Sequence, residues 1–323
     1  MSDTLDSVRV VALAGGVGGA KLAHGLALTG LGERLSVVIN TADDFTLYGL
    51  HISPDLDTVL YTLGGLANPT TGWGVVDDSL VTLDMMKRYG VDTWFMLGDK
   101  DLATHILRTG RLRDGQRLTT VMGDFAQALG IEARLLPMCD EPVGTKVRTA
   151  DGLLDFQEYF VRRRHSDDVS EIVFDGIERA ALPTGVLDAI DGADLLVICP
   201  SNPFVSVDPI LAVPGMRDCI TRSAAPVIAV SPIIGGAAVK GPAAQMLASL
   251  GHEVSSAGVA AYYSDLIDVL IIDEVDSELA PAIEDLGVRA AIASTLMRTD
   301  EDRAVLARFT IEAGLQAQSD ARG

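Results

Sequence analysis

Short runs of β-branched and other apolar residues alternate along the chain with longer segments in which apolar residues recur every three or four positions. The short runs predict buried strands, and the longer segments predict amphipathic helices. Such alternation is typical of a parallel sheet covered by helices, so the expected fold class is α/β. The expected strands are residues 8–13, 35–39, 195–199, 227–230 and 269–272. The expected helices are residues 20–28, 80–89, 102–108, 118–129 and 242–250.

One region interrupts this alternation. Residues 146–161 form two extended runs around the turn sequence Ala150-Asp151-Gly152, which predicts an antiparallel hairpin. The chain then returns to the α/β pattern at Leu182. We therefore expect three parts: residues 1–133 as the first part of the core, 134–181 as an inserted subdomain with antiparallel strands, and 182–323 as the second part of the core.

Composition and charge narrow the classes of function. Hydrophobic residues make up 48% of the 323 residues and charged residues 22%, which is enough apolar material for a large core. The formal net charge of −20 repels nucleic-acid phosphates and anionic lipids, so neither is an expected partner. Three cysteines without paired spacing, and an N-terminus without a basic and apolar leader, predict a reducing, cytoplasmic location.

A glycine-rich turn follows the first expected strand and leads into an apolar helix. Gly15, Gly16, Gly18 and Gly19 stand there, with Lys21 two residues further on. Backbone amides at such a turn can approach a phosphate at a helix N-terminus. The spacing matches neither the dinucleotide fingerprint nor the Walker A loop, and a tight turn that simply requires glycine is the alternative. The pattern therefore indicates an anion site, with a phosphate as the expected ligand.

Four carboxylates follow the second expected strand. Asp43 and Asp44 belong to one loop, and Asp55 and Asp57 belong to the sequence SPDLD that comes next. Loops after strands of a parallel sheet meet at its ligand-binding edge, where carboxylates hold the divalent cation that accompanies a diphosphate. The alternative is helix capping, by Ser53 or Asp55.

A third polar loop follows residues 94–96, an expected strand. Lys100 is an isolated cation on this loop and is a candidate contact for an anion or a ring oxygen. His105 lies four residues from Asp101, so it is either an ordinary i, i+4 partner of Asp101 or a catalytic group.

Two later loops complete the candidate site. Each follows a strong expected strand, so both should reach the same crevice, although serine, proline and asparagine are also common turn formers. The candidate residues on these loops are Ser201, Asn202 and Ser231.

Taken in order, these segments resemble the 2-phospho-L-lactate transferase family that builds coenzyme F420. The resemblance runs from residue 14 to about residue 297. Its motifs are AGGVGGAKL, NTADD, SPDLDTVLYTLGG, GWGVVDDS, LGDKDLATHI, RLLPM, DFQEYFV, PSNPFVSV, ILAVPGM, SPIIGGAAVKGPA, VSSAGVAAYY and STLM.

The resemblance implies a Rossmann-like core, a homodimer and dependence on Mg²⁺. It also implies that a guanosine diphosphate adduct of a three-carbon acid is the donor, that the deazaflavin FO is the acceptor, and that GMP is released. Asp57 then resembles the acidic residue that contacts FO near the metal, and Lys100 the basic residue that contacts FO. On the sequence alone Asp57 is expected on a loop facing solvent or ligand, so Asp57→Asn should remove activity and leave stability almost unchanged.

Two other functions compete with this one. The first is a nucleotide-sugar-binding regulatory protein of the same superfamily, against which the motifs PDLDT and LGDKD argue. The second is a nicotinamide dehydrogenase, but Asn40 stands where the ribose-binding acid of such an enzyme is expected.

Overall fold

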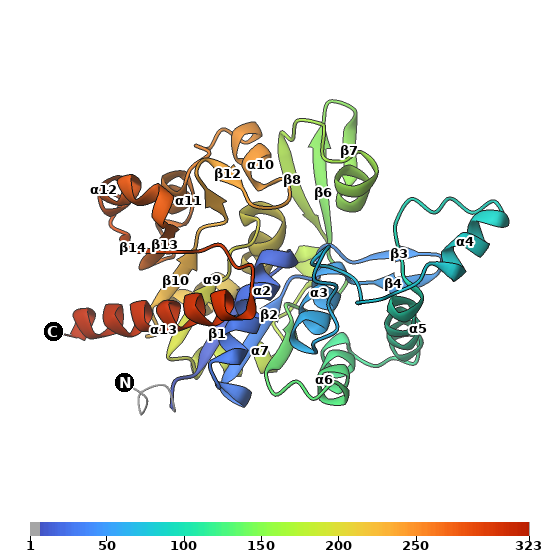
Figure 1. Ribbon diagram of the computed structural model, residues 1–323, viewed down its shortest axis with the longest axis horizontal. Coiled ribbons are helices and arrows are strands. Elements are labelled where there is room, and N and C mark those ends of the chain that lie inside the picture. Colours follow the sequence, from blue (N-terminus) through green and yellow to red (C-terminus); the bar gives the residue numbers. More distant parts are fainter. Residues whose placement is uncertain (1–6, 323) are drawn as a thin grey trace.

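The computed structural model describes residues 7–322 and is built around a seven-stranded sheet (Figure 1). The strand order is β14-β13-β10-β9-β1-β2-β5, and all neighbouring pairs are parallel. These strands are β1 (Val10–Ala14), β2 (Leu35–Ile39), β5 (Arg134–Pro137), β9 (Leu195–Ile198), β10 (Val227–Val230), β13 (Val269–Asp273) and β14 (Arg289–Ala293). The predicted α/β fold class is confirmed.

The sheet is buried on both faces because its side chains alternate between two cores. Val11 and Leu13 of β1 enter one core, whereas Val10 and Ala12 enter the other. The core that contains Val10 is closed by α2 (Gly16–Leu28), α3 (Pro54–Leu63), α6 (Leu118–Ala128) and α13 (Asp300–Arg322). The core that contains Val11 is closed by α7 (Thr184–Asp191), α8 (Asp208–Ala212), α9 (Met216–Arg222), α10 (Ala243–Ser249), α11 (Ser256–Tyr263) and α12 (Ala280–Glu284).

A small antiparallel sheet packs on the core that contains Val11. It consists of β6 (Gly144–Thr149), β7 (Gly152–Asp155) and β8 (Glu171–Asp175) in the order β7-β6-β8, with Val147 of β6 in the core. The preceding strand β5 pairs with β2 in the central sheet. The antiparallel region therefore starts after Pro137, later than the residue 134 boundary expected from the sequence.

An arm extends from the body beside α3 and is seen at the right of Figure 1. It contains β3 (Phe45–Leu47), β4 (Leu50–Ile52), α4 (Val81–Arg88) and the start of α5 (Asp99–Arg113). The strand expected at residues 94–96 does not form. The rings of Trp94 and Phe95 instead pack on Phe45, with centroid distances of 6.2 and 5.0 Å.

The remaining elements are short. They are η1 (Gly32–Arg34), η2 (Glu158–Arg162), η3 (Ile177–Arg179), η4 (Pro203–Val207), η5 (Glu274–Leu279), β11 (Ile233–Ile234) and β12 (Ala237–Ala238). Among the described residues, no helix combines the length and the apolar character needed to cross a bilayer.

Candidate active site

A large cavity opens where the chain reverses its direction across the sheet. From β1 the chain proceeds to β2 on one side, whereas β9 lies on the other side of β1 and continues to β10. Open α/β sheets bind ligands at this point, beyond the carboxyl ends of the strands. The cavity has a volume of about 830 Å³ and is lined by the loops after β1, β2, β9 and β10.

The glycine-rich turn forms one wall and is packed too tightly for side chains. A Cβ atom at Gly15 would lie 2.6 Å from Oδ2 of Asp55, and one at Gly18 would lie 2.2 Å from the carbonyl oxygen of Pro200. At Gly16 the reason is the backbone: its φ of +62° lies in the left-handed region, which residues with a side chain rarely adopt. Gly15, Gly16 and Gly18 line the cavity, whereas Gly19 is buried behind them. Packing therefore requires these glycines, and it also leaves the start of α2 open to the cavity.

Two lysines stand beside this turn. Nζ of Lys21 donates to the carbonyl oxygen of Met297 at 2.9 Å, and Nζ of Lys240 donates to that of Thr71. Burial lowers the pKa of both amines, and the charges of Arg303 and Lys240 lower that of Lys21 further. A bound anion would relieve the repulsion between these cations. Lys240 was not singled out as a site residue from the sequence, although it lies within the motif SPIIGGAAVKGPA.

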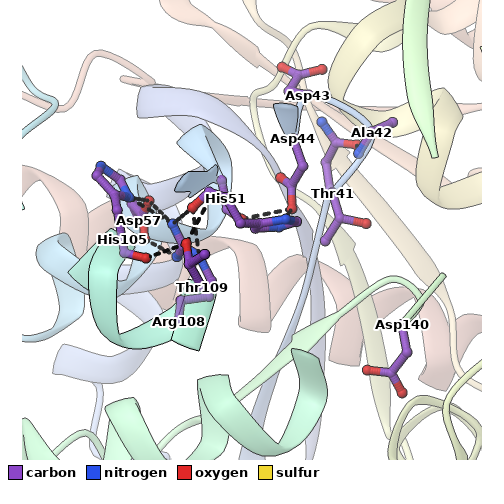
Figure 2. Close-up of polar contacts among 12 residues, drawn as sticks. Thr41, Ala42, Asp43, Asp44, His51, Asp57, His105, Arg108, Thr109 and Asp140 are labelled. Atoms are coloured by element: carbon purple, nitrogen blue, oxygen red, sulfur yellow. Dashed lines mark hydrogen bonds and ion pairs between the residues drawn. The ribbon is translucent and has the colours of Figure 1, made fainter. Parts of the chain in front are cut away.

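Asp43 and Asp55 are buried carboxylates that line the cavity, and no cation pairs with them within residues 7–322 (Figure 2 shows Asp43). Asp55 accepts hydrogen bonds from the Gly16 amide at 2.8 Å and from Nδ2 of Asn40 at 2.9 Å. Oδ1 of Asp43 is buried and has no hydrogen-bond partner among the residues that the structure describes, although the side chains of Asn40 and Thr145 lie near the carboxyl group and partly offset the rise that burial causes in its pKa. Burial raises the pKa of Asp43 well above its usual range, and the charge of Asp55 raises it further. Burial likewise raises the pKa of Asp55, to about 6.

Asp44 is separated from this pair. Its Oδ2 accepts from the hydroxyl of Ser53 at 2.7 Å and lies 2.9 Å from Nε2 of His51. Asp44 does not line the cavity. Ser53 stands at the N-terminus of α3 but makes no side-chain cap, so the capping role considered for it is not what its hydroxyl does.

Asp57 is buried in an ion pair, which contradicts its expected position on a loop (Figure 2). It lies in the first turn of α3, and Arg108 donates to both of its carboxylate oxygens, at 2.6 and 2.8 Å. The expectation that its removal would leave stability almost unchanged is therefore wrong on physical grounds, because a buried guanidinium would lose its counter-charge. Asp57 still lines the cavity.

His105 contacts Asp101 as the i, i+4 spacing predicts, with 3.2 Å between Nε2 and Oδ2. The hydroxyl of Tyr61 donates to the other oxygen of Asp101 at 2.6 Å. Asp57, Asp101 and His105 place one ligand atom each within 4.8 Å of one another, so this buried group could bind a metal ion. All four residues line the cavity.

Lys100 lies outside the lining of the cavity. Its Nζ donates to the carbonyl oxygen of Val76 at 2.8 Å, and its backbone amide donates to Asp78. Lys100 therefore braces the segment that follows Trp73 and Gly74, which do line the cavity.

The polar residues after β9 and β10 reach the cavity as predicted. Oγ of Ser201 donates to the carbonyl oxygen of Gly15 at 2.9 Å and so joins the two loops that flank the crevice. Oδ1 of Asn202 accepts from the Phe204 amide at 3.0 Å, and Oγ of Ser231 lies 3.0 Å from that of Ser256. Ser201, Asn202 and Ser231 all line the cavity.

Aromatic side chains form another part of the lining. They come from α3, from the arm with its connecting segments, and from the segment after β7. The rings of Phe156 and Phe160 are stacked with a centroid distance of 5.4 Å and an angle of 6°. The aromatic residues of the lining are Tyr61, Trp73, Trp94, Phe95, Phe156 and Phe160. The cavity thus combines a polar wall suited to an anion with an apolar wall suited to a flat ring.

Comparison with known proteins agrees with this geometry. The family profile described as 2-phospho-L-lactate transferase CofD matches residues 10–304. A 2-phospho-L-lactate transferase of Methanosarcina mazei is 41% identical over 304 residues, covering 94% of this chain and 100% of that protein. A phosphoenolpyruvate transferase of Streptomyces griseus is 44% identical over 312 residues, covering 94% and 98%. A crystal structure of a UPF0052 family protein from Bacillus halodurans has the same fold, with a TM-score of 0.66, 14% identity, and coverage of 94% and 98%.

Proposed function

The chain belongs to the CofD family of 2-phospho-L-lactate transferases, and we propose that its cavity joins a guanosine diphosphate adduct of a three-carbon acid to the deazaflavin FO. It is a transferase of coenzyme F420 biosynthesis. In the reaction, a ribityl hydroxyl of FO attacks the phosphorus that carries the three-carbon acid. The bond to the bridging oxygen breaks, GMP leaves with that oxygen, and the hydroxyl proton is released. The observation that carries the proposal is a single cavity with an anion-binding wall and an aromatic wall.

The donor fits the polar wall. The amides at the start of α2 and the amines of Lys21 and Lys240 face one end of the cavity, where a diphosphate would offset their partial and full charges. Ser201, Asn202 and Ser231 add hydroxyl and amide groups on the adjacent loops. Attack on a diphosphate depends on positioning and charge neutralisation, which these groups supply.

The acceptor fits the aromatic wall. The deazaflavin ring would pack against the side chains contributed by the arm and by the segment after β7, while its hydroxylated chain would face α3. Asp57 is an ionised acceptor on that helix and would accept a hydrogen bond from a ribityl hydroxyl.

The carboxylates that suit Mg²⁺ are Asp43 and Asp55. Among residues 7–322 neither has a cationic partner and Oδ1 of Asp43 is buried without a hydrogen bond, which is the environment that a divalent cation would relieve. In the group Asp57, Asp101 and His105, both oxygens of Asp57 already accept from the cation Arg108, whereas the oxygens of Asp55 accept from a backbone amide and an asparagine, which are neutral. When bound, Mg²⁺ would neutralise the charge of the diphosphate.

The direct test is incubation of the protein with FO and each donor, with and without Mg²⁺, followed by mass spectrometry. The relatives named for phospholactate and for phosphoenolpyruvate are about equally similar, so both guanosine diphosphate adducts are supplied in parallel. The expected result is a phosphodiester adduct of FO together with GMP. Tight binding of a nucleotide sugar without turnover of either donor would favour the regulatory function instead.

Lys100→Ala should weaken FO binding more than GDP binding. The side chain holds Val76, which continues into the rim of the cavity, whereas the anion-binding turn is on a different loop. Because Lys100 is exposed and acts on the rim, we expect a change of only about two- to tenfold in the dissociation constant of FO. Fluorescence titration of FO and calorimetry with GDP measure the two constants. Equal losses of affinity for FO and for GDP would contradict the assignment of Lys100 to the FO end of the cavity.

We further propose that the protein is a homodimer in the cytoplasm. Val81, Met85 and Tyr89 lie four residues apart on α4 and are 70%, 46% and 79% exposed, and Ile106 and Leu107 add exposed apolar surface on α5. A second copy would cover this surface. Light scattering should show a dimer that Met85→Glu converts to a monomer, and a wild-type monomer would refute the proposal.

The free thiols Cys139, Cys199 and Cys219 suit a reducing compartment.

A further inference from the structure

Arg108 is a fully buried cation next to the cavity. It lies on α5 with 0% of its surface exposed and does not line the cavity. A buried charge costs several kcal/mol unless it is well paired, and replacing a buried ion pair by apolar side chains is often neutral or stabilising. Stability alone therefore gives little reason for an arginine at this position. Because Arg108 does not reach the cavity, any role in function must act through its neighbours.

The guanidinium group holds two residues that do line the cavity. It donates to Oδ1 and Oδ2 of Asp57 at 2.6 and 2.8 Å, and Nη2 lies 2.9 Å from Nδ1 of His105. Its remaining contacts are to the carbonyl oxygen of His51 at 3.2 and 3.4 Å. The planar fork matches the carboxylate in a way that a lysine amine cannot.

This arrangement also fixes the tautomer of His105. Arginine has donors and no acceptor, so the 2.9 Å contact is a hydrogen bond when Nδ1 of His105 accepts and carries no proton; Nδ1 also lies 3.5 Å from Oδ2 of Asp57. In that tautomer the ring proton is on Nε2, which lies 3.2 Å from Oδ2 of Asp101 without the geometry of a hydrogen bond. Oδ1 of Asp101 accepts from the hydroxyl of Tyr61. One buried cation thereby orients Asp57 and His105 directly and places the Nε2–H group of His105 beside Asp101.

We propose that Arg108 is a positioning residue for the acceptor end of the cavity: it holds Asp57 as an ionised acceptor and His105 in the Nε2–H tautomer, so that Asp57 and Asp101 present fixed oxygens to the hydroxyl groups of the acceptor. The assignment of these hydroxyls to FO rests on the proposed function. The orientation of Asp57 and His105 does not.

The first test separates positioning from stability. Arg108→Lys keeps the positive charge but loses the planar guanidinium fork. Arg108→Met loses both the charge and the fork. The double variant Asp57→Asn with Arg108→Met removes both charges of the ion pair. We expect Arg108→Lys to lower kcat/KM for FO about tenfold to a hundredfold while the dissociation constant of GDP stays within about twofold. The double variant should recover the melting temperature lost by Arg108→Met, which would assign that loss to the unpaired charge of Asp57. Wild-type kcat/KM for FO in folded Arg108→Lys would show that Arg108 is only structural.

The matched control is Arg111→Met on the same helix. Arg111 is partly exposed and pairs with Asp124 and Gln116 away from the cavity. The Arg111→Met variant should shift the melting temperature by no more than a few degrees. Its kcat/KM for FO should stay within about twofold of the wild type. An equal loss of kcat/KM in this variant would mean that α5 as a whole, rather than Arg108, controls the site.

The second test does not depend on the acceptor. The chain has five histidines, so ¹⁵N NMR of the histidine rings can be assigned with single His→Gln variants. His105 should show a protonated Nε2 and an unprotonated Nδ1 in the wild type, and this signature should be lost in Arg108→Met. A protonated Nδ1 in the wild type would overturn the proposal. If the tautomer is as expected but FO does not bind, the proposed function fails while the role of Arg108 in orienting His105 stands.

Discussion

Asp43→Asn is expected to abolish most Mg²⁺-dependent turnover while leaving the metal-free protein at least as stable as the wild type. Asparagine preserves the shape of the side chain but removes one of the two carboxyl groups of the Asp43 and Asp55 pair, which has no cationic partner in the described part of the chain. Loss of one preorganised electrostatic partner typically lowers kcat by about a hundredfold to a thousandfold. Turnover across a Mg²⁺ titration measures the effect. Wild-type turnover at low Mg²⁺ would show that Asp43 does not hold the cation.

The pH dependence of stability provides a separate check on the same pair. The pKa of Asp55 is raised to about 6, and that of Asp43 is raised well above its usual range, so both carboxyl groups bind protons more tightly in the folded state. Their contribution to stability is therefore complete at low pH and is lost as the pH rises through about 6 and above. Melting curves recorded in EDTA from pH 5 to pH 8 should show Asp43→Asn gaining stability relative to the wild type as the pH rises. A constant difference between the two proteins would mean that Asp43 is not titrating in this range.

Hydrophobic patterning predicted the central strands well and the edge strands poorly. Residues 35–39 and 227–230 form β2 and β10 with the predicted bounds, because β-branched runs buried on both faces have no other stable environment. The edge strands β5 and β14 were not predicted. β5 ends in Pro137, and β14 has the sequence RAAIA, whose alanines have a low strand propensity. Their pairing with neighbouring strands, which local sequence does not record, determines their conformation.

For the candidate site, the sequence located groups but did not reveal how they pair. The glycines, Asp43 and Ser201 reach one cavity because they follow parallel strands, which is a topological consequence of the fold, whereas Asp55 reaches it from the first turn of α3 after the antiparallel pair β3–β4. The ion pair between Asp57 and Arg108 joins α3 to α5 over 51 positions of sequence, so no local pattern could assign it. A partial signal was present: Asp101, His105 and Arg108 are spaced by four and three residues, which places them on one face of a helix.

Asp57→Asn should impair both activity and stability, and the stability loss is the part that the sequence did not predict. Asp57 supplies both acceptors for a guanidinium group that has no exposed surface. Asparagine offers one acceptor oxygen and sets an amide donor against the other arm of the fork, so a buried positive charge is left without its counter-charge. Breaking a buried pair from one side typically costs about 3 to 5 kcal/mol, which corresponds to a fall in melting temperature on the order of 10 °C.

Activity should fall even under conditions in which the variant is fully folded. The ionised acceptor for the ribityl hydroxyl is lost, and its loss should reduce kcat/KM for FO by about a hundredfold or more. The informative experiment measures kcat/KM and the dissociation constant of FO at a temperature well below the melting transition of the variant, with circular dichroism confirming the fold. Asp57→Glu serves as the comparison, because it keeps the charge but displaces the oxygens from the fork of Arg108. If Asp57→Asn binds and turns over FO like the wild type at that temperature, then Asp57 stabilises the fold and has no part in acceptor binding.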